Sequence, residues 1–269
     1  MKKKIRILFL GDTQGEPGVA MFKKWTPILK EKHKIDAIFV NGENSAKNGK
    51  GITPELVKEF KKFGASVITS GNHVWGNKKI YSLIDDKNEI LLRPANYPSV
   101  CPGRGHIIID VDGVDIAVIN IQGRVFMAED LDCPFRCVES LLTFLKNRAK
   151  IVFVDFHAET TSEKQAMLHF LNGKVSGLFG THTHVQTADE RITEEGTSYI
   201  TDLGFAGALN SSLGVEYNII LNRFLTQMPA QFKIEKNGPM TLNGVWVEVD
   251  TETGNAVHIE RVNITDSVI

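Results

Sequence analysis

The chain has 269 residues, of which 42% are hydrophobic and 23% are charged, so its composition is that of a globular protein with a large core rather than of a disordered segment. Its 31 Lys and Arg residues nearly balance its 32 Asp and Glu residues, which predicts neither a broad nucleic-acid surface nor a membrane-binding face. The first apolar run ends at Gly11 and Asp12, too early for a signal peptide, and no later run is long enough to cross a bilayer. We expect a cytoplasmic protein with a single domain over residues 1–269, and the sequence leaves a homo-oligomer open.

The first 70 residues alternate between strand and helix patterns. Short apolar runs at 5–10, 37–40 and 67–69 predict buried strands, and helical periodicity over 19–33 predicts the first helix. Thr53 and Pro54 are typical of a helix N-cap and of the first helical position, so a second helix is expected through Lys62. This order predicts a mainly parallel sheet with right-handed crossovers.

The remainder predicts a hairpin, further helices and a second sheet. Asp112-Gly113, between apolar runs at 106–110 and 114–121, is a strong hairpin signal. Helices are expected at about 138–148, after a capping box at 160–163, and between 215 and 225; strands are expected at 151–156, from Val175, and at 198–201, 230–234, 242–249 and 256–262. The expected fold class is therefore α/β (α+β), with two packed mixed β-sheets flanked by helices.

Residues of metal-ligand type follow five of the predicted strands. In α/β sheets, binding sites form where loops leave the carboxyl ends of strands, so side chains from these loops can converge. The candidates are Asp12, Glu43 with Asn44, Asn72 with His73, His157, and His182 with His184. Such a mixture of carboxylate, amide and imidazole suits manganese, iron or zinc, and the three cysteines lack the C-x-x-C spacing of a structural zinc site.

Each motif taken alone has a simpler interpretation. The loop at 11–18 could be only a turn, because it has neither common phosphate-binding glycine pattern. Asn72-His73 could be a helix cap with a surface imidazole, His157 a hydrogen-bonded core residue, and the pair in GTHTH two unliganded loop residues. The loop at 47–51 is expected to be solvated, and the alternative is that its lysines contact a substrate phosphate. The joint placement favours a site, and four other histidines are left structural: His33, His106, His169 and His258.

The ordered motifs Asp12, Glu43-Asn44, Gly71-Asn72-His73, His157 and GTHTH at 180–184 resemble those of the calcineurin-like metallophosphoesterases. The resemblance is closer to their bacterial YmdB-like branch, of the 2′,3′-cyclic-nucleotide phosphodiesterase type. It rests on NGENSA at 41–46, RPANYP at 93–98, VDFHAETTSEK at 154–164, GTHTHVQTADERI at 180–192 and TDLG at 201–204. It extends almost from end to end and implies a four-layer αββα metallophosphoesterase sandwich, in agreement with the two-sheet prediction.

The resemblance also implies two metal ions per chain, with iron or manganese favoured over zinc or magnesium. One ion would be held by Asp12, Glu43, Asn44 and His184, and the other by bridging Glu43, Asn72, His157 and His182. The usual first motif of the superfamily is D-x-H, but Gln14 stands at the position of that histidine. Thr13-Gln14 and the stretch 205–208 are less typical of the branch, so the substrate pocket could differ there without a change of ligands.

The implied function is hydrolysis of a small-molecule phosphodiester, a cyclic nucleotide such as 2′,3′-cyclic AMP. Two neighbouring ions would lower the pKa of a shared water that attacks the phosphorus in line, and His73 is the candidate general acid. Two alternatives stay open: a phosphomonoesterase or protein phosphatase, and a nucleotide-binding regulatory protein with slow turnover. A metal-dependent amidohydrolase is least favoured, because its H-x-H motif usually follows the first barrel strand.

Overall fold

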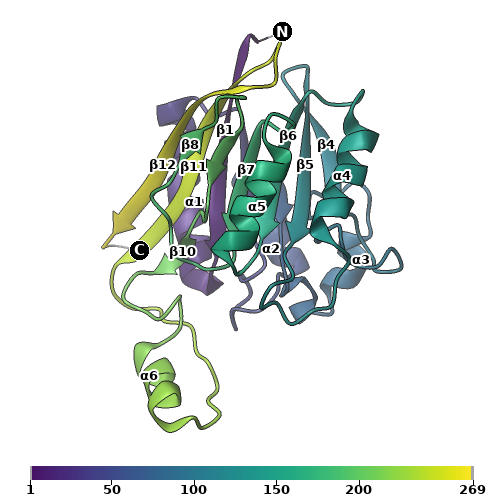
Figure 1. Ribbon diagram of the computed structural model, residues 1–269. Coiled ribbons are helices and arrows are strands. Elements are labelled where there is room, and N and C mark those ends of the chain that lie inside the picture. The colour runs from purple at the N-terminus through teal and green to yellow at the C-terminus, as the bar shows by residue number, and fades with distance from the viewer. Residues whose placement is uncertain (1, 268–269) are drawn as a thin grey trace.

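Two six-stranded β-sheets packed face to face form the centre of the computed structural model, which describes residues 2–267 (Figure 1). The first sheet has the order β12-β11-β10-β1-β2-β3, with β1 Lys4–Thr13, β2 Ala37–Asn41, β3 Ala65–Thr69, β10 Phe205–Ala208, β11 Met240–Asp250 and β12 Ala256–Asp266. The second has the order β4-β5-β6-β7-β9-β8, with β4 His106–Val111, β5 Val114–Gln122, β6 Ile151–His157, β7 Gly177–Thr181, β8 Arg191–Ile192 and β9 Ser198–Ile200. Each sheet contains parallel and antiparallel pairs, which confirms the two mixed sheets expected from the sequence.

Helices cover the outer faces of both sheets, as Figure 1 shows. On the first sheet lie α1 Gly15–His33 and α2 Pro54–Lys62, whose Phe22 and Phe60 rings meet edge to face at 4.8 Å, and a short 3₁₀ helix, Val74–Gly76, leads from β3 to α3 Ile80–Ile84. On the second lie α4 Pro134–Leu145 and α5 Thr161–Leu171. The layers are thus helix, sheet, sheet, helix, which is the expected sandwich. Among the described residues, no helix has the length and apolarity that a membrane span requires.

Aromatic side chains fill the space between the two sheets. The ring of Phe9 in β1 lies 4.9 Å from that of Phe39 in β2, 4.8 Å from Phe153 in β6 and 4.4 Å from Phe179 in β7. All four are buried, and each buried ring stabilises the fold by roughly 1.5–3 kcal/mol. This cluster fixes β1, β2, β6 and β7 relative to one another, and these are four of the five strands that precede the candidate ligands.

The predicted helix caps and hairpin turn form, one of the caps only in part. Thr53 Oγ1 accepts a hydrogen bond from Leu56 N at 3.3 Å, and Thr160 Oγ1 accepts one from Glu163 N at 3.4 Å. The Glu163 carboxylate does not return to the cap but accepts from the backbone after β5, so the capping box is only half formed. Asp112 and Gly113 join β4 to β5 with φ values of 54° and 82°, the left-handed conformations of a tight hairpin turn.

Some boundaries differ from the predictions, and one predicted strand is wrong. The first helix begins at Gly15 rather than near residue 19, and α4 begins at Pro134 and ends at Leu145. In the stretch 230–234 only Ile234 pairs, through an isolated bridge to Val215. Its alternating pattern has no neighbouring strand to join, so the segment stays irregular.

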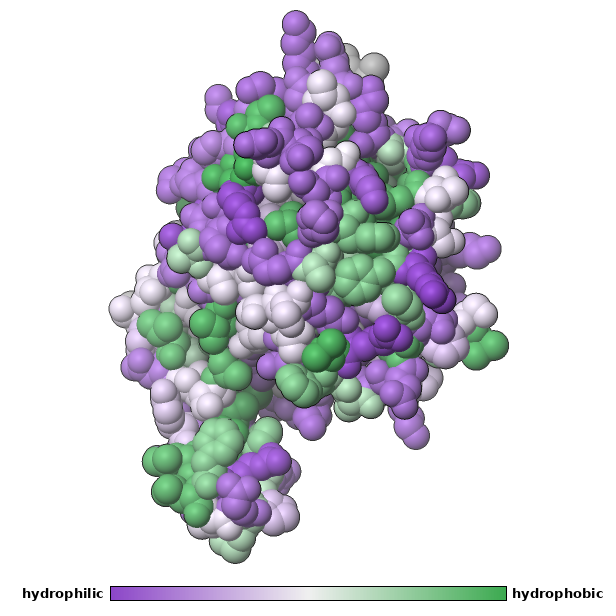
Figure 2. Space-filling view, in the orientation of Figure 1, coloured by the Kyte–Doolittle hydropathy of each residue, from purple (hydrophilic) through white to green (hydrophobic). Residues whose placement is uncertain are grey.

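Residues 209–238 leave the sandwich between β10 and β11 and form a lobe that carries α6 Tyr217–Thr226 (Figure 1). No residue of α6 is buried. Figure 2 shows apolar side chains gathered on this lobe, and its exposed apolar residues include Tyr217, Leu221, Phe224, Leu225 and Met228. The ends of the lobe nevertheless reach the candidate site, where they line its cavity.

Candidate metal centre

The structure brings the predicted ligand loops together at one edge of the sandwich. Asp12 lies near the end of β1, Glu43 and Asn44 follow β2, and Asn72 follows β3. His157 is the last residue of β6, and His182 and His184 follow β7. Asp12, Glu43, Asn44 and His157 are buried, whereas Asn72 and the other two histidines are partly exposed.

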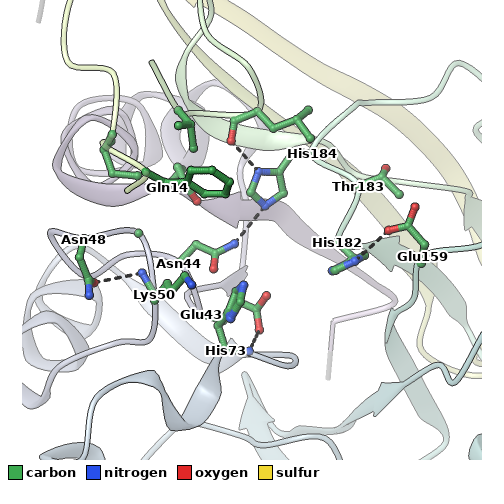
Figure 3. A pocket seen from close by; sticks show the side chains of 15 residues that line it. Gln14, Glu43, Asn44, Asn48, Lys50, His73, Glu159, His182, Thr183 and His184 are labelled. Carbon is green, nitrogen blue, oxygen red and sulfur yellow. Dashed lines mark hydrogen bonds and ion pairs between the residues drawn. The ribbon is translucent and has the colours of Figure 1, made fainter. Parts of the chain in front are cut away.

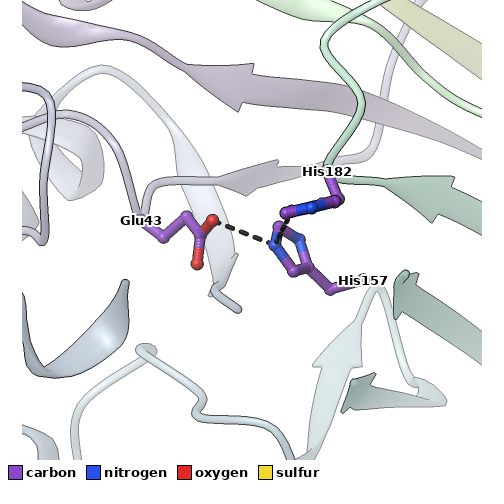
Figure 4. A group of neighbouring side chains, drawn as sticks. All are labelled: Glu43, His157 and His182. Carbon is purple, nitrogen blue, oxygen red and sulfur yellow. Dashed lines mark hydrogen bonds and ion pairs between the residues drawn. The ribbon is translucent and has the colours of Figure 1, made fainter. Parts of the chain in front are cut away.

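One nitrogen atom lies at the centre of the first group of side chains. His157 Nε2 lies 3.0 Å from Glu43 Oε1, 3.1 Å from Asn72 Oδ1 and 3.0 Å from His182 Nδ1. Figure 4 shows Glu43 and His182 both directed toward this ring. A single ring nitrogen carries at most one proton and cannot donate to three partners, whereas one bound cation can take all four groups as ligands. One ligand atom from each of Glu43, His157 and His182 lies within 4.8 Å of the others, as a metal site requires.

A second group consists of Asp12, Asn44 and His184. His184 Nε2 lies 3.0 Å from Asn44 Nδ2 and 3.7 Å from Asp12 Oδ1. Two buried oxygen atoms in the second group, Asp12 Oδ1 and Asn44 Oδ1, have no hydrogen-bond partner, and Glu43 Oε1 in the first group has only the imidazole nitrogen of His157, at 3.0 Å. Buried acceptors are rarely left unpaired, and a bound cation is one of the common explanations. The atoms present therefore fit a metal centre with carboxylate, amide and imidazole donors.

The two histidines of the GTHTH stretch reach the site from a strained loop that follows β7. β7 ends at Thr181, and the two histidines beyond it have positive φ values, 103° for His182 and 60° for His184. Such conformations are unfavourable for residues other than glycine and concentrate at functional sites. His182 N donates to Asp12 Oδ2 at 3.1 Å, which ties this loop to the end of β1.

Thr181 anchors the outer nitrogen of His157. Thr181 Oγ1 donates its proton to Asp155 Oδ1 at 2.7 Å, so it must accept the proton of His157 Nδ1, which lies 2.9 Å away. A second hydroxyl, that of Thr69, donates to the other oxygen of Asp155. With Nδ1 bound to Thr181, His157 Nε2 faces the converging ligand atoms, as in sites where an outer acceptor orients a metal-binding imidazole.

The other two histidines are anchored in the same way. His182 Nε2 lies 3.0 Å from Glu159 Oε2, and His184 Nδ1 lies 3.2 Å from the backbone oxygen of Leu213. Both acceptors hold a proton on the outer nitrogen and leave the inner nitrogen free for a ligand bond. The sequence motifs predict none of these outer acceptors. Asp155 and Thr181 are polar residues in buried strands, which is a signal that could have identified them. The backbone carbonyl of Leu213 gives no signal in the sequence.

The charges of the site favour a cation. Burial acts to raise the pKa of Asp12 and Glu43, but the imidazoles of His184 and His157 outweigh it and hold the pKa of each carboxyl below its ordinary value. Burial acts to lower the pKa of His157, yet Glu43 and Asp12 raise it to about 9. Burial and the charge of His157 lower the pKa of His182 to about 3. The two buried carboxylates thus draw positive charge to the point where the ligand atoms meet.

The ligand cluster opens into a cavity of about 410 Å³, a size typical of small-molecule sites (Figure 3). His73 lines it, and the backbone N of His73 donates to Glu43 Oε2 at 3.0 Å. Burial lowers the pKa of His73, while the charge of Glu43 opposes the shift. Another part of the lining is apolar and comes from the lobe: Leu213, Val215, Phe232 and Ile234.

Gln14 and the stretch 205–208, where the sequence is less typical of the branch, both lie near the site but make different contacts. Gln14 lines the cavity and is 5% exposed, with its buried Oε1 unpaired. Phe205 does not line it but stacks on the ring of His184, with centroids 5.5 Å apart and planes at 7°. Lys50 lines the cavity, whereas Lys47 pairs with Glu16 at 3.9 Å. None of the four histidines left as structural lines the cavity.

Two solved structures share this fold along nearly the whole chain. The structure titled a novel phosphatase from Mycoplasma pneumoniae has a TM-score of 0.92 and 34% identity, covering 99% of this chain and 95% of that one. A hypothetical protein from Thermus thermophilus has a TM-score of 0.88 and 35% identity, covering 97% of this chain and 100% of that one. The fold and the site define the class: an enzyme of metallophosphoesterase type, which hydrolyses phosphoric esters.

The sequence comparison defines the family more narrowly. The family model described as "YmdB-like protein" matches residues 8–262. The 2′,3′-cyclic-nucleotide 2′-phosphodiesterase of Bacillus subtilis (strain 168) is 45% identical over 262 residues, which cover 97% of this chain and 98% of that protein. The chain belongs to the YmdB-like family, and the resemblance drawn from its motifs is confirmed.

Proposed function

We propose that the chain is a metal-dependent phosphodiesterase that hydrolyses cyclic nucleotides of the 2′,3′-cyclic AMP type. The observation that carries the proposal is the convergence of ligand atoms around His157 Nε2, together with the unpaired buried oxygens of Asp12 and Asn44. The substrate class is supported by the printed activity of the Bacillus subtilis relative.

In this proposal the cluster would hold two metal ions, with Glu43 as a ligand of both. Asp12, Asn44 and His184 would complete the first site, and Asn72, His157 and His182 the second. When bound, two such ions supply Lewis acidity, which lowers the pKa of water and offsets the negative charge of a phosphodiester. The donors mix imidazole with carboxylate and amide oxygens and include no thiolate, which suits iron, manganese or zinc, and the family resemblance favours iron or manganese.

His73 is the proposed general acid for the leaving oxygen. Hydrolysis of a cyclic diester adds the oxygen of water to phosphorus and breaks one P–O bond, so the departing ribose oxygen needs a proton. His73 lines the cavity, and its backbone is held by the proposed bridging residue, Glu43. Burial lowers the pKa of His73, and the negative charge of a bound phosphodiester acts in the opposite direction by favouring the imidazolium.

The apolar part of the cavity is the proposed place for the nucleoside. A cyclic nucleotide joins a charged phosphodiester to a flat, weakly polar base, and the cavity combines ligand side chains with an apolar lining in the same way. Phe232 is 38% exposed and lines the cavity, so its ring is available to stack on a base. Base stacking on an aromatic ring contributes roughly 1–3 kcal/mol.

A phosphomonoesterase is the second candidate, because the Mycoplasma pneumoniae structure is titled a phosphatase. The two activities separate when release of 4-nitrophenol from bis(4-nitrophenyl) phosphate is compared with release from 4-nitrophenyl phosphate, at equal metal loading. The proposal predicts a higher kcat/KM for the diester. A clear preference for the monoester would overturn it.

A further inference from the structure

A buried ion pair outside the proposed ligand set contacts the loop that carries His182 and His184. Lys164 in α5 and Asp202, which follows β9, are each 1% exposed, and Lys164 Nζ lies 2.7 Å from Asp202 Oδ2. Removing two charges from water is unfavourable, and apolar residues often replace such pairs without loss of stability. Stability alone therefore does not account for this pair.

The Asp202 carboxylate binds the backbone of two ligand-bearing segments. Its Oδ2 accepts from the N–H of Thr183, which lies between the two histidines, at 3.1 Å. Its Oδ1 accepts from Gly204 N at 2.9 Å, and the carbonyl of Gly204 accepts from Asp12 N at 3.1 Å. One carboxylate thus connects the histidine loop to the end of β1.

These bonds act where the backbone is strained and closely packed. His182 and His184 both have positive φ values, so the loop needs external contacts to keep their side chains turned toward the site. A Cβ added at Gly180 would lie 1.8 Å from the carbonyl oxygen of Thr201 and 3.0 Å from Lys164 Cδ. The end of β7, from which the loop leaves, therefore packs directly against the segment that carries Asp202 and against the Lys164 side chain.

We infer that the Lys164–Asp202 pair is a positioning device for the metal centre. Asp202 holds the loop through Thr183 N–H, and Lys164 supplies the positive charge that lets a carboxylate remain buried in this position. Neither residue is a ligand; both act through the geometry of His182, His184 and Asp12. This inference rests on the proposed metal centre.

The test compares Mn²⁺ binding by the parent, Asp202→Asn, Lys164→Gln and a matched control, Glu163→Gln. Glu163 is the neighbour of Lys164 in α5; it is also buried and also accepts backbone N–H bonds, but from Arg124 and Val125, in a loop without proposed ligands. Each chelator-treated protein is titrated with Mn²⁺ in a calorimeter, below the unfolding transition of every variant. We expect Asp202→Asn to lower the affinity for at least one ion by about 10- to 100-fold, with the control at the parent's affinity.

The outcomes separate this inference from the proposed centre. Two ions bound by the parent and by Asp202→Asn with equal affinity would overturn the positioning role and leave the centre standing. No Mn²⁺ binding by the parent would overturn both. An equal loss in Asp202→Asn and Glu163→Gln would show a general effect of removing a buried charge, which also overturns the role. If Asp202→Asn does not fold, Lys164→Gln carries the test, since it keeps a donor for Asp202 and should lower affinity by a smaller factor.

Discussion

Replacing Thr181 with valine tests how far the candidate metal centre depends on the anchoring of His157. The Thr181 hydroxyl is buried, accepts from His157 Nδ1 at 2.9 Å and donates to Asp155 Oδ1 at 2.7 Å. Valine has nearly the same shape, so the substitution removes the hydroxyl while leaving the packing around it largely unchanged.

The size of the effect follows from the hydrogen bond that is lost. A buried N–H without an acceptor is unfavourable by about 1–3 kcal/mol, and each 1.4 kcal/mol is a factor of ten in an equilibrium constant. If this penalty falls on the ligand-competent orientation of His157, metal affinity falls by about 5- to 150-fold. Loss of an outer partner of a metal-binding imidazole typically lowers metal affinity by about 10- to 100-fold, which lies in the same range.

The assay is a Mn²⁺ titration in competition with a fluorescent chelator. Thr69→Val is the matched control, because the Thr69 hydroxyl donates to the other oxygen of the same Asp155 and not to His157. We expect Thr181→Val to lower the affinity and Thr69→Val to leave it near the parent value. The reasoning is refuted if Thr181→Val stays within about twofold of the parent, or if both variants lose affinity equally.

Further predictions concern Glu43 as the bridging ligand, His73 as the general acid and Phe232 in the apolar lining of the cavity. Glu43→Ala should lose both bound metal and hydrolysis, measured by metal analysis and turnover; full activity in this variant would exclude a shared carboxylate. His73→Asn should keep two ions while kcat for 2′,3′-cyclic AMP falls by about 10²- to 10⁴-fold, with a much smaller loss on a 4-nitrophenyl diester, whose leaving group needs no proton. Equal losses on the two substrates would remove the acid role. Phe232→Ala should raise KM for the cyclic nucleotide about tenfold and leave KM for a small alkyl diester unchanged, as followed by steady-state kinetics. An unchanged KM for the nucleotide would place the base elsewhere.

Features that depend on local chemistry could be predicted from the sequence. Thr53 and Thr160 form the caps that their residue types indicate, and Asp112-Gly113 forms the hairpin turn. The parallel order of the early strands brings Asp12 and Glu43 to the same edge of one sheet, so the convergence of their loops also followed from topology.

Features that depend on distant backbone could not be predicted. The anchor of His184 is the carbonyl of Leu213, and every residue type offers a carbonyl. The alternation at 230–234 predicts a strand, but pairing requires a neighbour that the sequence alone does not locate. The sequence places His182 and His184 just after a strand, but it does not predict the positive φ values that orient both rings beyond the end of β7.

The most direct test of the account is incubation of the purified, manganese-supplemented protein with 2′,3′-cyclic AMP, with metal content measured on the same sample and Glu43→Ala as the blank. The account predicts two ions per parent chain and turnover by the parent alone, and the position of the remaining phosphate shows which ester bond is broken. Two bound ions without turnover would contradict the phosphodiesterase assignment and favour another phosphoester or a binding role.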